Sequence, residues 1–549
     1  MLEITPLQNF SLGAQVAILV GGSAVLAVVL NVLAQLALPK DRSAPPVVFH
    51  WVPIVGSAVT YGIDPYKFFF DCREKYGDVF TFVLLGRRVT VALGAKGNNL
   101  ILNGKLSQVS AEAAYTHLTT PVFGKEVVYD VPNAVLMEQK KFVKVGLSTD
   151  NMRVYVDQIV DEVNKYIASD KVFAPFQGKK ELKETDETRL DIFKSMSEIT
   201  ILTASRTLQG REVRENLDAS FAQLYHDLDA GFTPLNFVIP NLPLPGNFRR
   251  DRAQLAMSRF YQTIIKNRRD GKASGIDDDE HDMIAALMQQ SYKNGRQLSD
   301  VEIAHMMIAL LMAGQHTSSA SGSWILLRLA SRPDIVEELW AEQNQVWGDG
   351  SGSLRPLDYE TLKSSTPLLD AVIRETLRLH PPLHSLMRKV MSPITVPPTL
   401  ASPGSRKSGG AGGGDDAAYV IPEGHYVMAA PGVSQVDPHL WPNAEEFDPK
   451  RWLDASSVVV QQEREDAESE KVDFGWGAVS SGANSPYLPF GAGRHRCIGE
   501  QFAYLQLGTI ISTFVRRFRW SLQEGFPDPD YTSMVVLPKH GKIIITPRV

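Results

Sequence analysis

The hydropathy pattern begins with one long uncharged segment. Residues 10–39 contain no charged side chain and are rich in Val, Leu and Ala. About 20 apolar residues span a bilayer as a helix, so residues 12–39 predict a transmembrane anchor behind a short lumenal N-terminus, residues 1–11. Lys40 and Arg42 follow directly, and the positive-inside rule then places the rest of the chain in the cytosol. A cleaved signal peptide is the alternative, although the apolar run is long for one and no basic region precedes it.

Beyond the anchor, two kinds of periodicity divide the chain. Short apolar strands alternate with turns over residues 47–95, and helical periodicity dominates from about residue 150 to 395. Residues 301–328 predict one long apolar-rich helix, which Pro333 would end. Further strand patterns occur at residues 388–396 and 418–428. The pattern therefore predicts a mainly α fold with a small β region.

Proline, glycine and charge mark the expected boundaries. Two consecutive prolines follow the anchor, and because proline fixes φ and blocks a helix, residues 40–56 predict a hinge before one domain at 57–549. Two segments look inserted, about 402–416, which is rich in Gly and Ser, and 455–485, which contains a highly charged stretch. Because loops tolerate insertion, we expect both to be flexible surface loops without a chemical role.

Composition narrows the class of protein. The 549 residues are 44% hydrophobic and 21% charged, as in an ordinary globular protein, and the net charge is -6. Nucleic-acid binding requires a basic face, so no nucleic-acid partner is expected. The two cysteines, Cys72 and Cys497, exclude a disulfide framework and fit folding in a reducing compartment.

One of these cysteines lies in a basic, glycine-rich segment, Phe490-Gly491-Ala492-Gly493-Arg494-His495-Arg496-Cys497-Ile498-Gly499. Cys497 is expected to open a helix over residues 498–518, where backbone amides and cations lower the pKa of a thiol. Gly493 and Gly499 would allow a positive φ or a close approach to a flat macrocycle, and Phe490 is expected to cover the sulfur. A thiolate held in this way is a strong axial ligand for haem iron. A buried structural cysteine is the alternative.

Two further motifs precede this loop. Glu375 and Arg378 are three residues apart on one helical face, and Arg451 lies in Phe447-Asp448-Pro449-Lys450-Arg451-Trp452. Alone, the first spacing would indicate a surface ion pair. The order E-x-x-R, F-x-P-x-R and F-x-x-G-x-x-x-C-x-G, however, resembles the cytochrome P-450 family throughout. The resemblance implies a P-450 fold, haem b with Cys497 as metal ligand, and a buried structural triad of Glu375, Arg378 and Arg451.

A polar string lies within the long helix, Ala313-Gly314-Gln315-His316-Thr317-Ser318. Glycine and hydroxyls loosen a helix, so an interruption is expected here. By the same resemblance this is an oxygen-binding groove, in which Thr317 and ordered water deliver protons to O2. Most of the family carries Asp or Glu where His316 stands, and Gly-Gln-His-Thr-Ser is similar to one branch, the sterol 14-alpha-demethylases. Histidine can relay protons, and the resemblance offers Asp229 as its partner; a histidine that only hydrogen-bonds within the core is the alternative.

A second segment resembles the same branch. Residues 115–130 look like its substrate-recognition segment, and their aromatic side chains suit a pocket for a large lipid. For the haem propionates, the resemblance implies contacts from donors that fit two carboxylates: Tyr115, Tyr129, Lys140, Arg388 and His495. For the sterol, it implies contacts from Tyr115, Phe123, Tyr129, Phe232, Leu310, Ser385 and Met534. Aromatic core packing is the alternative for each aromatic residue taken singly.

The resemblance, which is to fungal members, also implies a reaction. It is removal of the 14-alpha methyl group of lanosterol or 24-methylenedihydrolanosterol by three oxygenations with release of formate, in ergosterol biosynthesis, and azole inhibitors would bind. Because no nucleotide-binding or flavin motif accompanies the Cys497 loop, electrons are expected from NADPH through a separate NADPH–cytochrome P-450 reductase in the endoplasmic reticulum membrane. The alternatives are a P-450 acting on another lipid and a non-enzymatic sterol-binding membrane protein.

Overall fold

The computed structural model describes residues 11–177, 182–271, 282–397, 419–457, 471–482 and 484–548, with residues 179, 400, 460–461 and 464. The predicted insertion at 402–416, residues 1–10 of the predicted lumenal segment 1–11, and part of 455–485 lie outside them. The chain forms two compact units. The first comprises Met1–Leu93, Lys105–Ser110 and Met387–Ala429, and the second comprises Gly94–Gly104, Ala111–Leu386 and Ala430–Val549. The segment 57–549, predicted as one domain, therefore contributes to both.

The first unit begins with the apolar helix α1 (Leu12–Ala37). Within the described part of the chain it is the one helix long and apolar enough to cross a membrane, and none of its residues is buried. Two polar side chains near its end bind the segment that follows it: Asn31 donates to the carbonyl oxygens of His50 and Trp51 at 2.8 and 2.9 Å, and Gln35 donates to that of His50 at 2.7 Å. The helix is thus hydrogen-bonded to its own unit.

The segment predicted as a hinge also pairs with a strand. The N–H of Val48 donates to the carbonyl oxygen of Thr81, and the N–H of Thr81 donates to that of Pro46, both at 2.8 Å. Farther along, the N–H of Ser57 donates to the carbonyl oxygen of Val83 at 2.8 Å. The chain therefore joins the fold of the first unit from Pro46 onward.

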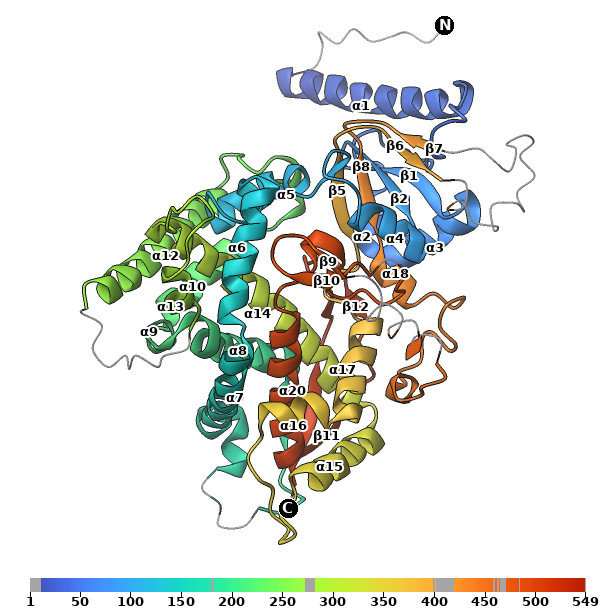
Figure 1. Cartoon of the computed structure of the whole chain (residues 1–549). Coiled ribbons are helices and arrows are strands. Elements are labelled where there is room, and N and C mark those ends of the chain that lie inside the picture. The colour runs from blue at the N-terminus through green and yellow to red at the C-terminus, as the bar shows by residue number, and fades with distance from the viewer. Residues whose placement is uncertain are drawn as a thin grey trace, which may run out of the picture. The chain divides into compact units, whose positions relative to one another are not determined.

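The main sheet of the first unit has five strands in the order β1-β2-β8-β5-β3, of which β1, β2, β8 and β5 are labelled in Figure 1. β1 and β2 are antiparallel, β2 and β8 are parallel, and β5 and β3 are antiparallel. The predicted strand at 418–428 is two strands, since Gly424 turns the chain with φ +80° between them. The elements of the unit are α2 (Ala58–Ile63), α3 (Pro65–Tyr76), β1 (Val79–Leu84), β2 (Arg87–Ala92), β3 (Val109–Ser110), β5 (Leu386–Val390), β6 (Ile394–Val396), β7 (Tyr419–Ile421) and β8 (Tyr426–Ala429).

The long helix α14 (Asp300–Ala330) lies at the centre of the second unit. Ser299 and Glu302 form a capping box at its start, and most of its residues are buried, as expected for a helix that is apolar on every side. The interruption predicted at residues 313–318 is wrong, because the helix is continuous. The Thr317 hydroxyl donates to the carbonyl oxygen four residues back, at 2.8 Å, and this bond is compatible with helical geometry.

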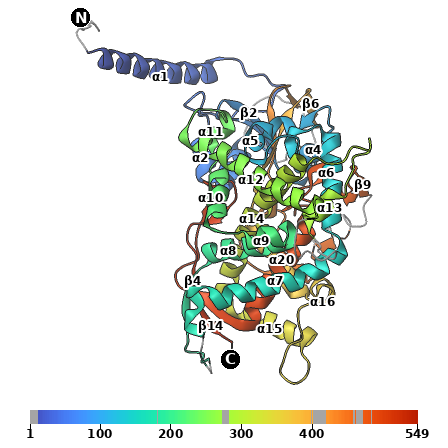
Figure 2. The same cartoon turned by 90° about the vertical axis from the view of Figure 1, so that its left-hand side faces the viewer.

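Helices α8, α12 and α20 pack against α14 (Figure 2), and α17 also packs against it. α20 begins at Glu500 and ends at Arg517, so the predicted helix at 498–518 is too long at both ends. The next residue, Phe518, begins a strand of the three-stranded sheet β11-β14-β4. The principal elements of the unit are α4 (Gly94–Leu102), α5 (Glu112–Phe123), α6 (Asn133–Gly146), α7 (Thr149–Ser169), β4 (Thr188–Asp191), α8 (Ile192–Ala204), α10 (Ala219–Asp229), α11 (Pro234–Val238), α12 (Pro245–Arg269), α13 (Met283–Met288), α15 (Pro333–Trp347), α16 (Tyr359–Ser364), α17 (Pro367–Leu379), α18 (Pro431–Gln435), β9 (Lys471–Asp473), β10 (Ala478–Ser480), β11 (Phe518–Leu522), β12 (Pro529–Asp530), β13 (Leu537–Pro538) and β14 (Lys542–Pro547).

Candidate functional site

Cys497 lies in a tight loop just before α20. Its N–H donates to the carbonyl oxygen of Phe490 at 2.9 Å, which closes the loop. The Cys497 side chain is exposed, yet many protein atoms lie around it. This is expected for a side chain that faces a space inside the protein. Burial raises the pKa of the Cys497 thiol, while a hydrogen bond from the N–H of Gly499 and the charge of Lys140 oppose the rise. A stable thiolate therefore needs a further positive partner, which a bound metal ion supplies.

The two glycines predicted to shape this loop have different roles. Gly493 has φ +65°, and a Cβ there would lie 2.5 Å from Oδ1 of Asn103 and 2.9 Å from the carbonyl oxygen of Leu102. Only glycine fits this position, because a Cβ would clash with Leu102, the last residue of α4, and with Asn103, which follows it. Gly499 has φ -84°, so it does not take the positive φ considered for it. A Cβ at Gly499 would be 3.9 Å from the Cys497 sulfur, which is an ordinary contact.

Lys140 of α6 supports the loop from the side. Its ammonium donates to the carbonyl oxygens of Arg494 and Arg496 at 2.9 and 2.8 Å and lies 3.8 Å from the ring centroid of Trp476. Burial lowers the pKa of Lys140 to about 7, and the negative charge of Cys497 opposes the fall. The predicted contact of Lys140 with a propionate stays a prediction. The structure adds a second role, which is to hold the backbone of the cysteine loop. Sequence reasoning missed this role, because contacts to carbonyl oxygens leave no sequence motif.

Three of the other predicted propionate ligands lie together. The rings of Tyr115 and Tyr129 stack with centroids 5.5 Å apart, and the His495 ring is 6.0 Å from that of Tyr129. Nε2 of His495 lies 3.9 Å from Oε1 of Glu112, a carboxylate that sequence reasoning did not include. Arg388 belongs to the first unit, where it is buried and donates to the carbonyl oxygen of Met387 at 2.7 Å. Its contact with a propionate stays a prediction.

The predicted triad residues meet in the buried core. Glu375 and Arg378 on α17 are both fully buried and form a bidentate pair with two 2.9 Å contacts. Nε of Arg451 donates to Oε1 of Glu375 at 3.0 Å, and the indole of Trp452 donates to its other oxygen at 3.0 Å. Arg378 also donates to the carbonyl oxygens of Gln435, Ala444 and Glu446. Every charge in this cluster is therefore paired and hydrogen-bonded, as burial requires.

His316 on α14 faces two oxygens from α10. Oδ1 of Asp229 lies 2.9 Å from Nε2 of His316, and the hydroxyl of Tyr225 lies 2.8 Å from the same nitrogen. The structure thus brings together the pair that the resemblance offered. Sequence reasoning missed Tyr225, although a tyrosine four residues before Asp229 on one helical face was the available signal.

The helix beside His316 borders open space. Ala313 is exposed although α14 is otherwise largely buried, and a Cβ at Gly314 would meet no atom within 4 Å. Thr317 lies one turn farther along the helix and bonds to the carbonyl oxygen of Ala313. A groove that binds a small molecule along α14 would need an opening of this kind.

The predicted substrate contacts are only partly brought together. The rings of Phe123 and Phe232 are in edge contact with centroids 5.8 Å apart. Leu310 is half-buried on α14, and the Ser385 hydroxyl lies 2.8 Å from Nδ1 of His384. Met534 is 52% exposed. The roles of all five in sterol binding stay predictions.

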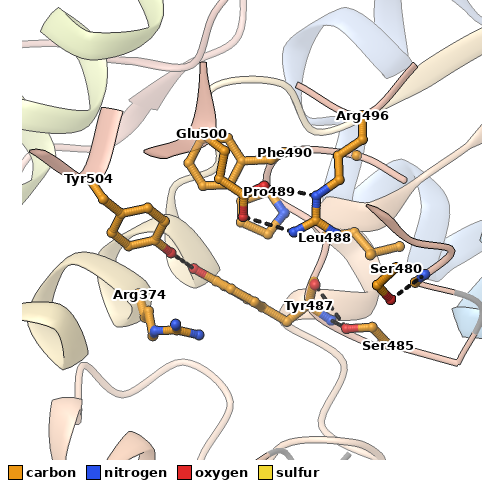
Figure 3. Close-up of a pocket in the computed structure, with 12 residues that line it drawn as sticks. Arg374, Ser480, Ser485, Tyr487, Leu488, Pro489, Phe490, Arg496, Glu500 and Tyr504 are labelled. Carbon is orange, nitrogen blue, oxygen red and sulfur yellow. Dashed lines mark hydrogen bonds and ion pairs between the residues drawn. The ribbon is translucent and has the colours of Figure 1, made fainter. Parts of the chain in front are cut away.

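A separate cavity of about 230 Å³ lies beside the cysteine loop (Figure 3). Phe490 and Arg496 line it together with Tyr487 and Tyr504, whose hydroxyls are 3.3 Å apart. The Phe490 ring lies 5.6 Å from that of Tyr504, so it packs between the loop and α20. Neither His316 nor Thr317 lines this cavity, which is therefore distinct from the opening along α14.

These residues fit a haem. Among the described residues, no group of three or more His, Cys, Asp or Glu side chains could hold a metal ion. Cys497 would then be a single protein ligand, and such an arrangement suits iron whose other ligands come from a macrocycle. Lys140 and the Tyr115–Tyr129–His495 cluster lie in the same unit as Cys497. Their hydrogen-bond donors suit the carboxylates of the haem propionates.

Comparison with known proteins identifies the class. The family model described as "Cytochrome P450" matches residues 45–406 and 413–545. A retinoic acid-bound cyanobacterial CYP120A1 has the same fold, with a TM-score of 0.68 and 19% identity over 92% of this chain and 99% of that one. The chain belongs to the cytochrome P-450 family, and it is a haem-thiolate monooxygenase that uses O2 and electrons from a redox partner.

Relatives define the branch. A lanosterol 14-alpha demethylase of Mycosarcoma maydis is 66% identical over all of this chain and 96% of its own length. An eburicol 14-alpha-demethylase of Uncinula necator is 52% identical over 94% of this chain and 92% of its own length. Within the P-450 family, the chain belongs to the fungal sterol 14-alpha-demethylases, enzymes of sterol biosynthesis.

Proposed function

We propose that the enzyme removes the 14-alpha methyl group of lanosterol or 24-methylenedihydrolanosterol. Three oxygenations would convert the methyl group to an alcohol, then to an aldehyde, and finally release formate and leave a 14,15 double bond. The observation that carries the proposal is the His316–Asp229 contact beside Thr317, in a helix that borders open space. The names of the two relatives support the choice of substrates.

Each residue of the site has a proposed task. A haem bound to the Cys497 thiolate supplies the oxygen chemistry. His316 and Asp229 move protons towards the opening along α14, since Asp229 is 42% exposed and connects His316 to solvent. Thr317 holds ordered water there through its hydroxyl. Phe123 and Phe232 present an apolar wall to the sterol.

The electron donor is proposed to be the membrane-bound NADPH–cytochrome P-450 reductase. Lys141 and Lys144 are exposed on α6, next to the residue that binds the cysteine loop. A positively charged surface at this position would attract an acidic electron-transfer protein to the side of the molecule that carries the thiolate. Salt should therefore weaken reduction of the enzyme.

The enzyme is proposed to reside in the endoplasmic reticulum membrane with its catalytic part in the cytosol. α1 is long enough to span the bilayer, and Lys40 and Arg42 follow it closely. A sterol substrate resides in the bilayer, so an anchored enzyme meets it at high local concentration. In sealed microsomes, added protease should digest the catalytic part and spare α1.

Reconstitution tests the proposed reaction. The full chain, reductase and NADPH are combined with lanosterol or 24-methylenedihydrolanosterol in vesicles, and sterols and formate are identified by mass spectrometry. We expect one formate for each 14-demethylated sterol, and an azole should block both. A hydroxylated sterol that never loses its methyl group would instead indicate a P-450 that acts on another lipid. Absence of a carbon monoxide band for the thiolate form would favour a sterol-binding protein without haem.

A further inference from the structure

The nitrogen Nε2 of His316 has two oxygen neighbours. Asp229 and Tyr225 approach it at 2.9 and 2.8 Å from the same helix, α10. A ring nitrogen carries either one hydrogen or one lone pair, so it makes one strong hydrogen bond at a time. The two oxygens are therefore competitors for Nε2.

The two oxygens differ in what they can do. The carboxylate of Asp229 is an acceptor when ionised, and it binds an N–H more strongly than a neutral oxygen does. The Tyr225 phenol stays protonated, because burial and the neighbouring Asp229 raise its pKa above the ordinary value. Tyr225 can thus donate its O–H to a nitrogen lone pair, whereas an ionised Asp229 would repel that lone pair.

We propose that Tyr225 is a positioning residue that holds His316 whenever Nε2 has lost its proton. In one state the Nε2–H bond points to Asp229. In the other, the Nε2 proton has passed by way of the Asp229 carboxylate to solvent, the carboxylate is ionised again, the imidazole keeps its remaining N–H, and the Tyr225 hydroxyl rotates to donate to Nε2. Tyr225 gives up no proton. This inference rests on the proposed relay and deepens it.

The consequence is that the ring has a partner in both states. A half-buried imidazole nitrogen without a partner is left unsatisfied, and the ring becomes free to rotate. The Tyr225 ring also packs against the imidazole, with centroids 5.5 Å apart and planes inclined by 33°. The imidazole therefore keeps one orientation in both states, and only the hydroxyl hydrogen of Tyr225 moves.

Tyr225→Phe tests the proposal, because it removes the hydroxyl and keeps the ring. The control is Tyr261→Phe, which removes a buried hydroxyl that donates to Gln209 at 2.7 Å on another helix. Full-length enzyme with 15N-labelled histidine is observed by NMR in its diamagnetic, reduced and carbon monoxide-treated form, and His316→Gln assigns the signal. We expect Tyr225→Phe to shift the Nε2 resonance only at high pH, where Nε2 is unprotonated. An unchanged resonance, or an equal change in both states, would overturn the proposal.

Turnover gives the second measurement. Tyr225→Phe should increase peroxide released per NADPH by about two- to fivefold, as expected for the loss of one hydrogen bond, and Tyr261→Phe should not. Asp229→Asn distinguishes failure of the Tyr225 proposal from failure of the relay. If Asp229→Asn raises peroxide release and Tyr225→Phe does not, the relay stands and the inference fails. If neither Asp229→Asn nor His316→Gln changes coupling, the proposed relay itself fails, whatever the NMR result.

Discussion

The ammonium of Lys140 lies 2.8 Å from the carbonyl oxygen of Arg496, the residue immediately before Cys497, the predicted haem ligand. A side chain on α6 thereby fixes the backbone of the cysteine loop. Burial of this ammonium has a cost, because it lowers the pKa of Lys140 from 10.5 to about 7. The loop is therefore held by a group whose charge depends on pH.

This contact predicts a pH dependence of stability. Between about pH 7 and 10.5 the unfolded chain binds more protons at Lys140 than the folded chain, so this group makes the free energy of unfolding rise with pH in that window. Lys140→Met should remove that rise, and Lys165→Met, on an exposed surface, should retain it. Denaturant titrations at several pH values measure both. An identical pH slope in Lys140→Met and the parent would contradict the prediction.

Replacement of the ligand should abolish the thiolate signal. Cys497→Ala is expected to lose the carbon monoxide difference band and all turnover, because no other thiolate is at hand. Cys72→Ala is the matched control. Cys72 is buried in the first unit, where burial raises the pKa of its thiol to about 12, so it stays a neutral thiol. The assignment of Cys497 would not survive if Cys497→Ala kept the band.

The triad should be intolerant of a single truncation. Arg378→Ala leaves Glu375 buried without its bidentate partner, and this costs about 3–5 kcal/mol, enough to prevent haem loading. Arg211→Ala breaks an exposed pair with Glu215 and should cost at most about 0.5 kcal/mol. Haem content per purified protein, from the absorbance of the bound haem, is the measurement. Normal haem content in Arg378→Ala would refute the structural role.

Thr317→Ala should uncouple the enzyme rather than unfold it. The Thr317 hydroxyl borders the opening along α14, and its loss would slow turnover and increase peroxide release by about tenfold, a typical effect for one group in proton transfer. Ser323→Ala removes a similar back-bonded hydroxyl from the buried part of the same helix. Peroxide formed per NADPH consumed distinguishes them. Equal coupling in the two variants would remove Thr317 from the relay.

Tyr129→Phe tests the propionate-binding site that the family resemblance implies. The ring should keep its stacking on Tyr115, while the lost hydroxyl should speed haem loss by about tenfold, equivalent to about 1.4 kcal/mol. Transfer of haem to apomyoglobin measures the rate, and Tyr166→Phe, whose hydroxyl donates to Glu198, is the control. Unchanged haem transfer and unchanged azole affinity would show that Tyr129 lies outside the site.

Motifs with short spacings could be read from the sequence. Glu375 and Arg378 occupy one helical face, so their contact follows from local geometry, and the family resemblance added Arg451. The resemblance also supplied Asp229 as the partner of His316. Tyr225 was missed because its partner is on another helix: its spacing from Asp229 places the two on one helical face, but it does not show what the hydroxyl of Tyr225 contacts.

Other differences between the predicted and the observed elements have specific physical causes. The start of α20 could not be placed because the N–H of Cys497 bonds to Phe490 instead of entering the helix. The continuity of α14 was missed because its glycine and hydroxyls were judged without the buried surroundings that stabilise a helix. The pairing of Pro46 and Val48 with Thr81 is tertiary, and two prolines in sequence indicated only a stiff connection.

The contacts of Asn31 and Gln35 bear on how such enzymes are shortened for study. A chain that starts after residue 38 would leave the carbonyl oxygens of His50 and Trp51 without their amide donors and the N–H of His50 without the Gln35 acceptor. Water would then solvate a surface that the full chain covers. Deleting α1 therefore removes a structural element of the first unit as well as the proposed membrane anchor.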